Sequence, residues 1–339
     1  MNGFYRATVA SNIAFLKYWG KRDKALQWPA NDSLSMTLDQ LKTETRARLY
    51  QGDDHLFRFE GRVYTRQTRQ FDKAFRHLDE LARLLGEERR LEIDTLNHFP
   101  IGAGMASSAS GLAALTIATL AAWLDAPTFD RLAAQGFSAE RLAHLSRLGS
   151  GSAGRSLFGG YVVWEAGVTA DQQRVWPFAP ATAWNLRDTV VVCSADEKSL
   201  SSSDAHQEAW SSPLFKPRLA GLPERMKAMQ AALERRDMES LGPLLETEAL
   251  EMHAVIMTAG QPHQYLAEAS LDFLVRLRNA RQAGKVQAYF TIDAGPNIHV
   301  IHEASEHEKL CQWLKSEYPT QLLLHDKVGS GPQLEYVSH

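Results

Sequence analysis

The sequence predicts an α+β fold divided into two domains, and three observations lead to this prediction. Short segments in the first 60 residues alternate apolar and polar side chains, which is typical of strands. Longer runs with apolar residues at helical spacing follow them. Between Val168 and Arg187 this periodicity fades and two prolines appear, which indicates a domain boundary. We therefore expect one domain over residues 1–185 and a second over residues 186–339.

The composition is that of an ordinary globular protein. The 339 residues are 44% hydrophobic and 23% charged, enough for a substantial core. The formal net charge is −3 and the basic residues are spread along the chain, which argues against a nucleic-acid surface. No apolar run approaches the length of a membrane span, and the first residues lack a signal-peptide pattern, so we expect a cytoplasmic protein without membrane contact.

The cysteine count argues against two further classes of structure. Cys193 and Cys311 are far apart and neither belongs to a CxxC pair. Neither a disulfide framework nor a structural zinc site is therefore indicated, and both are expected to be core or incidental thiols.

The first domain is expected to open with strands. Phe4–Ala14 reads as a strand that runs into a loop containing Lys17-Tyr18-Trp19-Gly20-Lys21. On the residues alone, these lysines and aromatics are best interpreted as a solvated turn with packed rings. Alternating residues then predict three strands, at Pro29–Leu38, Thr43–Tyr50 and Leu56–Phe59. Apolar residues at helical spacing predict a helix at Thr68–Leu85.

A loop rich in glycine and serine, Asn97–Gly111, joins the next strand to an apolar helix at Leu112–Leu124. Small residues let a phosphate approach the backbone, and a helix N-terminus supplies free N–H groups and a favourable dipole. Ser107 and Ser108 can add hydroxyls for a phosphate or Mg²⁺. The spacing fits neither the Walker A pattern nor the dinucleotide fingerprint. Without further information, the loop is about equally a nucleotide site or a tightly packed corner.

A second loop of this kind, Gly149–Gly160, follows a predicted helix at Ala139–Leu148. It is interpreted either as a flexible turn or as an anion nest in which Ser150 and Ser152 bind substrate oxygens. In the second interpretation, Arg155 presents its planar guanidinium to a carboxylate. A strand at Tyr161–Glu165 completes the first domain.

The second domain is expected to begin with a buried strand at Asp188–Ala195. The polar segment Lys198–His206 reads as a loop and helix cap. His253 lies on a mixed helix and is interpreted as structural. The remaining predictions are four helices between Leu214 and Ala283, strands at Ala288–Ile292 and Ile298–His302 around a turn at Asp293–Asn297, a helix at Glu303–Leu314, and a flexible or edge segment at Gly329–Pro332.

Four stretches, in order along the chain, resemble one family. Pro-x-Gly-Ala-Gly-x-Ala-Ser-Ser-Ala at 100–109 is similar to the phosphate loop of the GHMP kinases. Ala10–Ala14 with Lys17–Asp23, Gly149–Gly160 and Asp293–Asn297 resemble its diphosphomevalonate decarboxylase branch. The resemblance runs from about residue 6 to about residue 325. It implies the GHMP kinase fold, with antiparallel or mixed sheets covered by helices and the active site between two domains.

The resemblance also implies a role for each matching residue. It implies Asp293 as the catalytic carboxylate, Lys17 as the cation beside it and Arg155 as the partner of the substrate carboxylate. Substrate contacts are expected from Tyr18, Lys21, Ser150, Ser152, Ser202 and one basic residue of the 68–85 helix, for which we name Arg69. ATP contacts are expected from Asn97, Pro100, Gly102, Gly104, Ala106, Ser107, Ser108 and Ser110, with Ser107 also on Mg²⁺.

The implied reaction transfers the ATP γ-phosphoryl group to the 3-hydroxyl of 5-diphosphomevalonate and then eliminates phosphate and CO₂. One departure is visible: Ala205-His206 stands where the family has Gly-Met next to the substrate phosphates. It leaves open whether the 5-diphosphate, the 5-monophosphate or free mevalonate is preferred. A 3-kinase of the same branch and a non-catalytic ATP-binding sensor are the alternatives. The family tendency also predicts a homodimer.

Overall fold

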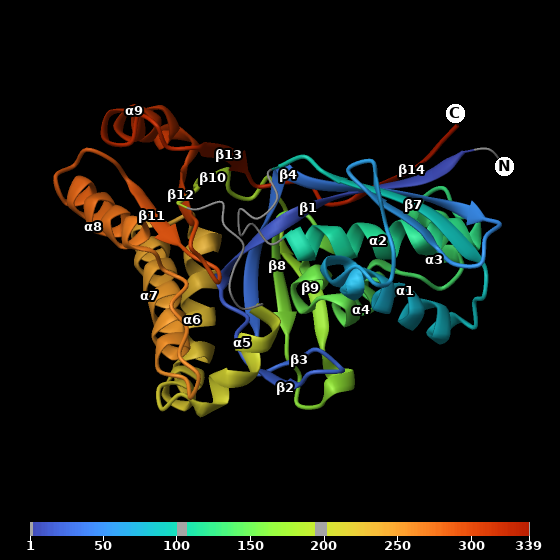
Figure 1. Cartoon of the computed structure of the whole chain (residues 1–339). Coiled ribbons are helices and arrows are strands. Elements are labelled where there is room, and N and C mark those ends of the chain that lie inside the picture. The colour runs from blue at the N-terminus through green and yellow to red at the C-terminus, as the bar shows by residue number, and fades with distance from the viewer. Residues whose placement is uncertain (1–2, 100–106, 194–201, 339) are drawn as a thin grey trace.

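The computed structural model describes residues 3–99, 107–193 and 202–338, and the predicted contacts of Pro100, Gly102, Gly104 and Ala106 lie outside this part. Two sheets with separate helical layers occupy opposite ends of the molecule (Figure 1). The α+β prediction is confirmed. No helix of the described residues is long and apolar enough to cross a membrane.

The first sheet contains eight of the described strands. Its main order is β14-β1-β4-β7-β5-β6, while β8 pairs with β4 and β9 pairs with β8. Every pairing is antiparallel except that of β5 with β7. The strands are β1 (Phe4–Leu16), β4 (Ser33–Tyr50), β5 (Leu56–Phe59), β6 (Arg62–Tyr64), β7 (Arg90–Asn97), β8 (Tyr161–Glu165), β9 (Arg174–Ala179) and β14 (Gln333–Val337). A separate hairpin pairs β2 (Lys21–Asp23) with β3 (Trp28–Pro29).

Helices cover one face of this sheet and form the first core with it. Apolar side chains of β1, β4 and β7 pack against an alanine-rich helix at the centre of the layer, which is buried nearly all round. The helices are α1 (Asp72–Leu85), α2 (Ser107–Leu124), α3 (Phe129–Ala134) and α4 (Ala139–Gly149), with short 3₁₀ segments at Arg69–Phe71, Gly151–Leu157 and Ala170–Gln172.

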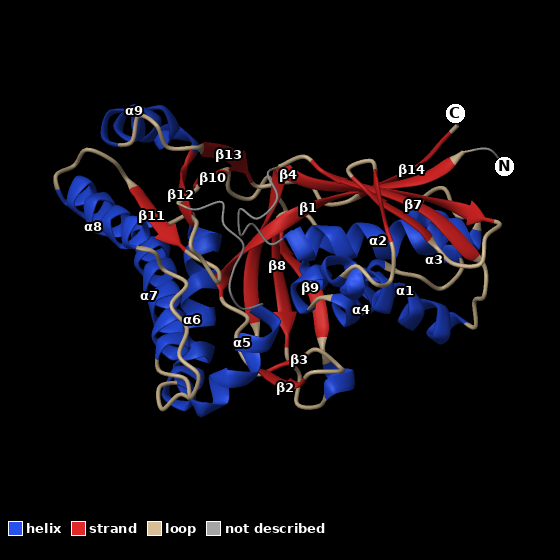
Figure 2. Cartoon of the chain, viewed as in Figure 1, coloured by secondary structure: helices blue, strands red, loops and turns tan. Residues whose placement is uncertain are grey.

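The second sheet is antiparallel in the order β11-β12-β10-β13. Its strands are β10 (Leu186–Val191), β11 (Ala288–Thr291), β12 (Ile298–Glu303) and β13 (Leu323–Lys327). The helices of this half, on the left of Figure 2, are α5 (Ser202–Glu208), α6 (Phe215–Arg235), α7 (Met238–Met257), α8 (Glu268–Gln282) and α9 (His307–Glu317), with 3₁₀ turns at Ala209–Ser211 and Ala304–Glu306.

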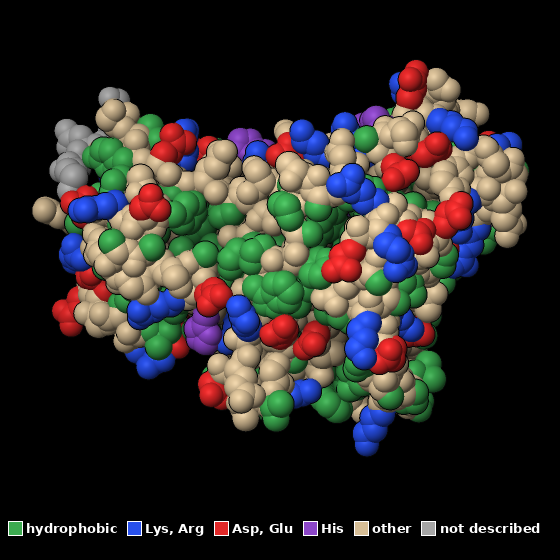
Figure 3. All heavy atoms as spheres, turned by 180° about the vertical axis from the view of Figure 1, so that it is seen from behind, with side chains coloured by type: hydrophobic (Ala, Val, Ile, Leu, Met, Phe, Trp, Pro, Cys, Tyr) green, Lys and Arg blue, Asp and Glu red, His purple; other side chains and the backbone are tan. Residues whose placement is uncertain are grey.

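The two halves share apolar contacts. One core cluster combines residues of the first sheet, such as Ile13 and Met36, with Leu241 of α7 and Ile301 of β12. The rear face shows hydrophobic side chains gathered across the middle of the molecule (Figure 3). The last strand, β14, returns to pair with β1, so both chain ends lie together in Figure 1. These contacts fix the position of the second sheet relative to the first.

Several predicted elements differ from the observed ones. The two strands expected before Tyr50 are one 18-residue strand, β4. Its polar middle leaves the pairing with β1, and the Asp326 carboxylate accepts the backbone N–H groups of Asp39, Gln40 and Leu41 instead. Within 214–283, which the structure describes throughout, three helices stand where four were expected, because residues 261–267 are not helical.

The expected boundary segment also contains a strand. β9 includes Pro177, and it pairs only with β8, at the edge of the sheet. A proline is tolerated there because an edge strand does not need every N–H group.

Candidate active site

An ion pair between the two halves lies at the centre of the candidate site. Lys17 follows β1, and its Nζ lies 2.8 Å from Oδ1 of Asp293 in the turn between β11 and β12. The same Nζ donates to the carbonyl of Ala14 at 2.8 Å. Lys17 is almost fully buried, whereas 28% of the Asp293 side chain is accessible. The carboxylate is therefore held on one side and open on the other.

The charges around Asp293 favour its ionised form. Burial by itself would raise the pKa of this carboxyl, but the Lys17 ammonium, His299 and Arg155 outweigh it and hold the pKa below its ordinary value. Burial lowers the pKa of Lys17, and the attraction of Asp293 opposes that change. A carboxylate with a lowered pKa is a weak base, well suited to orient a hydroxyl.

Two residues of α7 position this pair, and no motif in the sequence indicates their roles. Glu248 is fully buried, accepts the backbone N–H of Lys17 at 3.0 Å and pairs with Arg218 and Arg225. His253 Nε2 bonds to the carbonyl oxygen of Asp293 at 2.9 Å. His253 is therefore structural, as expected, and its specific role is to hold the backbone of Asp293. Neither role could be read from helical spacing, because both partners are distant in sequence.

Arg155 lies in the 3₁₀ segment after α4, where its guanidinium is buried and rigidly held. Its Nε donates to Oδ1 of Asn12 at 3.0 Å, and its Nη1 donates to Oγ of Ser33 at 2.8 Å. Asn12 is itself held by Ser156 at 2.9 Å. Burial lowers the pKa of Arg155 to about 10, with Asp293 and Tyr18 acting in the opposite sense. The other three N–H groups of the guanidinium have no bond to a described residue.

Tyr18 and the departure residue His206 form an aromatic layer beside the ion pair. The His206 ring lies between the rings of Tyr18 and Trp19, with centroid distances of 4.4 and 4.3 Å. Its Nδ1 accepts the backbone N–H of Gly20 at 3.1 Å, so the neutral ring carries its hydrogen on Nε2. Burial, followed by the charges of Lys21, Lys73 and Arg155, lowers the pKa of His206 well below its ordinary value.

The Tyr18 hydroxyl is buried and bonds to no described residue. It lies against the backbone of Gly151, where an added Cβ would come within 2.7 Å of the hydroxyl oxygen. Glycine at 151 is therefore required for this close approach. Since an unsatisfied buried hydroxyl is costly, the site has a donor ready for a ligand oxygen.

The serine-rich loops meet at the edge of this cluster. Ser108, in the first turn of α2, is exposed, and its Oγ atom lies 3.3 Å from the Oγ atom of Ser150. Asn12 bonds to the carbonyl oxygen of Ser152, whose residue is half-buried. The side chains of Ser107 and Ser202 lie outside the described part of the structure.

Two residues named as ATP contacts bond through their side chains to strands of the first sheet. Ser110 is fully buried and bonds to the hydroxyls of Ser11 at 3.1 Å and Thr43 at 2.8 Å. Asn97 accepts from the same Thr43 hydroxyl at 2.7 Å. Asn97 thus fixes the start of the loop, and Ser110 fixes the first turn of α2 at the other end.

The basic side chain of the 68–85 region that lies near the cluster is Lys73. Arg69 is exposed in the 3₁₀ turn before α1, and no described partner brings it to the site. Lys73, four residues later, is half-buried, and its charge acts on His206 and His77. Burial, with a further effect of Arg76, lowers its pKa to about 8. Lys21 is buried near His206 at the start of β2.

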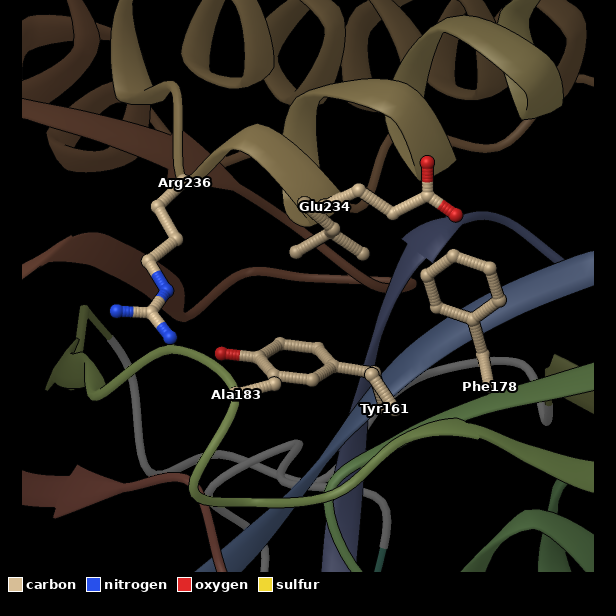
Figure 4. A pocket seen from close by; sticks show the side chains of 7 residues that line it. Tyr161, Phe178, Ala183, Glu234 and Arg236 are labelled. Atoms are coloured by element: carbon tan, nitrogen blue, oxygen red, sulfur yellow. The ribbon is translucent and has the colours of Figure 1, made fainter.

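The described residues also line a separate pocket, shown in Figure 4. Tyr161 and Phe178 of the first sheet face Glu234 and Arg236 at the end of α6. It contains none of the residues described above, so we do not assign the site to it.

Comparison with known proteins gives the same family along the whole chain. A model described as a diphosphomevalonate decarboxylase-like N-terminal domain matches residues 9–175, and a mevalonate 5-diphosphate decarboxylase C-terminal domain matches residues 189–335. The chain belongs to the diphosphomevalonate decarboxylase family. The family's enzyme from Candida albicans is 33% identical over 97% of this chain and 98% of its own, and that of Schizosaccharomyces pombe is 36% identical over 89% and 80%.

Solved structures of diphosphomevalonate decarboxylases share the fold. A structure from Enterococcus faecalis has a TM-score of 0.88 at 30% identity and covers 98% of this chain and 99% of its own. One from Staphylococcus aureus has a TM-score of 0.88 at 29% identity over 98% of each chain. A complex described as MDDEF with MVAPP, AMPPCP and magnesium has a TM-score of 0.89 at 30% identity, over 98% and 99%. The GHMP kinase fold implied by the resemblance is confirmed.

Proposed function

We propose that this protein catalyses the ATP-dependent decarboxylation of 5-diphosphomevalonate to isopentenyl diphosphate, releasing ADP, phosphate and CO₂. The observation that carries the proposal is the buried Lys17–Asp293 pair, with Arg155 close enough to act on both charges. A protein that only binds ATP has no need for this combination. The complex with MVAPP, AMPPCP and magnesium, whose fold this chain shares, supports the same substrates.

The reaction needs two steps because a tertiary hydroxyl is a poor leaving group. In the first, the 3-hydroxyl oxygen attacks the γ-phosphorus of ATP, ADP leaves and the hydroxyl proton is released. In the second, the C3–O bond breaks and phosphate leaves with its electrons, so positive charge develops at C3. The C1–C2 bond then breaks, its electrons form the C2–C3 double bond and CO₂ departs.

Asp293 orients the 3-hydroxyl and receives its proton late in the first step. The lowered pKa makes early proton abstraction unfavourable, and phosphoryl transfer through a loose transition state does not require it. Lys17 keeps the carboxylate ionised and fixed through their 2.8 Å contact. Positioning and electrostatics then supply most of the rate enhancement.

Arg155 holds the substrate carboxylate while the first step proceeds. Asn12 and Ser33 fix the guanidinium plane, so its remaining N–H groups can bind both oxygens of a carboxylate. Holding C1 in this way sets the C1–C2 bond in one orientation before it breaks. Ser152 and the neighbouring Ser150 supply further substrate contacts.

The 5-diphosphate group lies against Tyr18, Lys21, Lys73 and His206 in this proposal. Two lysines supply positive charge, while the Tyr18 hydroxyl and the His206 Nε2–H are neutral donors. His206 therefore replaces the family methionine with a donor that can reach a phosphate oxygen. Lys73 takes the part expected of Arg69, and Ser202 at the start of α5 is a further contact of the diphosphate.

ATP binds at the 97–111 loop and the start of α2. The described part of this region fits an anion, since the exposed Ser108 lies in the first turn of an 18-residue helix. Ser107 and Ser108 are the residues that would hold Mg²⁺, which neutralises phosphate charge when it is bound.

Three further expectations belong to this proposal. We divide the chain into two functional units, residues 1–185 and 186–339. We also expect a homodimer, and sedimentation of the purified protein tests this oligomeric state. We place the reaction in the cytoplasm, and the two unpaired cysteines fit a reducing compartment.

The decisive experiment supplies Mg-ATP with mevalonate, 5-phosphomevalonate or 5-diphosphomevalonate and scores ADP and CO₂ separately. We expect both products in equal amounts, with the 5-diphosphate as the preferred substrate. Asp293→Asn keeps the shape and removes the charge, so it should abolish both products while an ATP analogue still binds. ADP without CO₂ would identify a 3-kinase, and binding without turnover would identify a sensor.

A further inference from the structure

A cluster of histidine and cysteine side chains lies at the outer end of the second sheet. His307 and Cys311 are one turn apart on α9, and His325 lies on the neighbouring edge strand β13. One possible metal-binding atom from each of the three lies within 4.8 Å of the others. Cys311 Sγ is 3.6 Å from His307 Nε2 and 4.0 Å from His325 Nε2. Figure 1 shows α9 and β13 together at this end of the molecule.

These separations match those of a metal site. With Zn–S of about 2.3 Å and Zn–N of about 2.0–2.1 Å at tetrahedral angles, the sulfur and nitrogen ligands lie about 3.5–3.6 Å apart. The distance from Cys311 to His307 already has this value, and that from Cys311 to His325 must shorten by a few tenths of an ångström. His325 is exposed, so that shift meets little resistance. The ligand nitrogens of His307 and His325 lie within 4.8 Å of each other.

Hydrogen bonds outside the cluster leave the correct nitrogens free. His302 is fully buried, and its Nδ1 lies 3.0 Å from the carbonyl oxygen of Val300, which can only accept. The hydrogen of His302 is therefore on Nδ1, and its Nε2 accepts from His307 Nδ1 at 3.0 Å. This leaves the lone pair on His307 Nε2, the atom nearest to Cys311. Such outer contacts orient metal-binding histidines in many proteins.

His325 is oriented in the same way. Its Nδ1 lies 3.1 Å from the Thr189 hydroxyl, which can accept a hydrogen bond and leave Nε2 unprotonated. Two unprotonated imidazole nitrogens and one sulfur then lie within 4.8 Å of one another, next to the exposed side chain of His325. Arg187 acts electrostatically on His307, and Lys315 acts on Cys311 and His325, so the cluster has a positive surrounding. When a metal binds, the Cys311 thiol releases its proton to solvent and becomes the anionic ligand.

We propose that His307, Cys311 and His325 form a binding site for a divalent transition metal, Zn²⁺ by preference. Two imidazoles and a thiolate suit this ion and exclude the hard cations Mg²⁺ and Ca²⁺. The bound ion ties α9 to β13, and β10 contributes only the Thr189 hydroxyl that contacts His325. His302 stands on β12 at the end opposite the Asp293 turn, so this site is separate from the proposed catalytic centre. The spacing of the cysteines alone gives no such signal, because the ligands meet only in the folded chain.

The test uses full-length protein stripped of metal and titrated with Co²⁺ or Zn²⁺, without nucleotide and with excess Mg²⁺ to occupy oxygen-rich sites. We expect one equivalent of Co²⁺ to give a thiolate-to-cobalt charge-transfer band and tetrahedral ligand-field bands. We also expect Zn²⁺ to displace it and to raise the melting temperature.

The variants locate the site. Cys311→Ser should abolish the charge-transfer band, and both Cys311→Ser and His325→Ala should weaken Zn²⁺ binding by more than the 10- to 100-fold typical for loss of an outer contact. Cys193→Ser, the matched control, should behave as wild type. A thiolate band lost in Cys193→Ser and kept in Cys311→Ser would overturn the proposal. Equal Zn²⁺ affinity in wild type, Cys311→Ser and His325→Ala would show only an ordinary Cys–His hydrogen bond.

Discussion

Arg155 illustrates how a single residue of the candidate site is prepared for its ligand. An arginine in a glycine- and serine-rich turn would normally extend into solvent. Here, Asn12 and Ser33 hold one side of the guanidinium, and the other side bonds to no residue that the structure describes. The conformational entropy of the Arg155 side chain is therefore lost during folding, so substrate binding loses little further side-chain entropy.

Arg155→Lys tests this interpretation. Lysine keeps the charge but cannot bond to Asn12, Ser33 and both carboxylate oxygens at once. Loss of a charge-assisted bidentate pair is worth roughly 1.5–3 kcal/mol, about 10- to 150-fold in kcat/KM for 5-diphosphomevalonate. Affinity for an ATP analogue should remain unchanged, and Arg155→Ala should lose more activity. Wild-type kcat/KM in Arg155→Lys would show that the guanidinium geometry is not used.

At the scale of elements, the sequence patterns predicted the helices and strands whose ends depend on residues close together in the chain. The strand Tyr161–Glu165 was predicted with the observed bounds, because it is a short, almost continuously buried apolar run. The C-terminus of α1 at Leu85 was also predicted, because the apolar residues of this helix recur at helical spacing. The continuity of β4 was not predictable, because the Asp326 carboxylate that bridges its middle is almost 290 residues away. The loop motifs located the candidate site, but Glu248 and Lys73 carry no motif and emerge only from the packing of helices against it.

His77 provides a prediction for the packing of α1 on α2. Thr116 donates its hydroxyl to Leu112, so it must accept from His77 Nε2 at 2.8 Å. Burial, followed by the charge of Lys73, lowers the pKa of His77 to about 4. The unfolded chain, with a histidine pKa near 6.5, binds the proton more tightly, so stability is lost as the pH falls from about 6.5 towards 4.

His77→Gln keeps an N–H donor for Thr116 and does not titrate. When the pH is lowered from 7.5 to 5.0, the wild type should lose up to about 2 kcal/mol more of its free energy of unfolding than His77→Gln does. Urea unfolding at several pH values measures this difference. His98→Gln, at an exposed position, is the control and should follow the wild type. Parallel pH profiles for wild type and His77→Gln would contradict the assignment.

At the scale of the whole molecule, the site depends on how the two halves are joined. Lys17 comes from the first sheet, Asp293 from the second, and Glu248 of α7 holds the backbone of Lys17. The apolar cluster shared by both halves supports this arrangement. A rigid junction keeps the carboxylate and ammonium in contact before any substrate arrives, which is the preorganisation that electrostatic catalysis needs.

Glu248→Gln tests the junction directly. It removes the negative charge that Arg218 and Arg225 share, and breaking a buried ion pair in this way costs about 3–5 kcal/mol of stability. Glu251→Gln is the matched control, because Glu251 also lies on α7 and pairs with Arg225 of α6. Its side chain is 39% exposed, so loss of its charge should cost at most about 1 kcal/mol. Urea unfolding compares the two free energies, and kcat/KM is measured under conditions where both variants are folded. Glu248→Gln should also lower kcat/KM through the displaced Lys17, whereas Glu251→Gln should not. Equal stability losses would contradict the buried ion pair, and full activity in folded Glu248→Gln would show that Lys17 is positioned without Glu248.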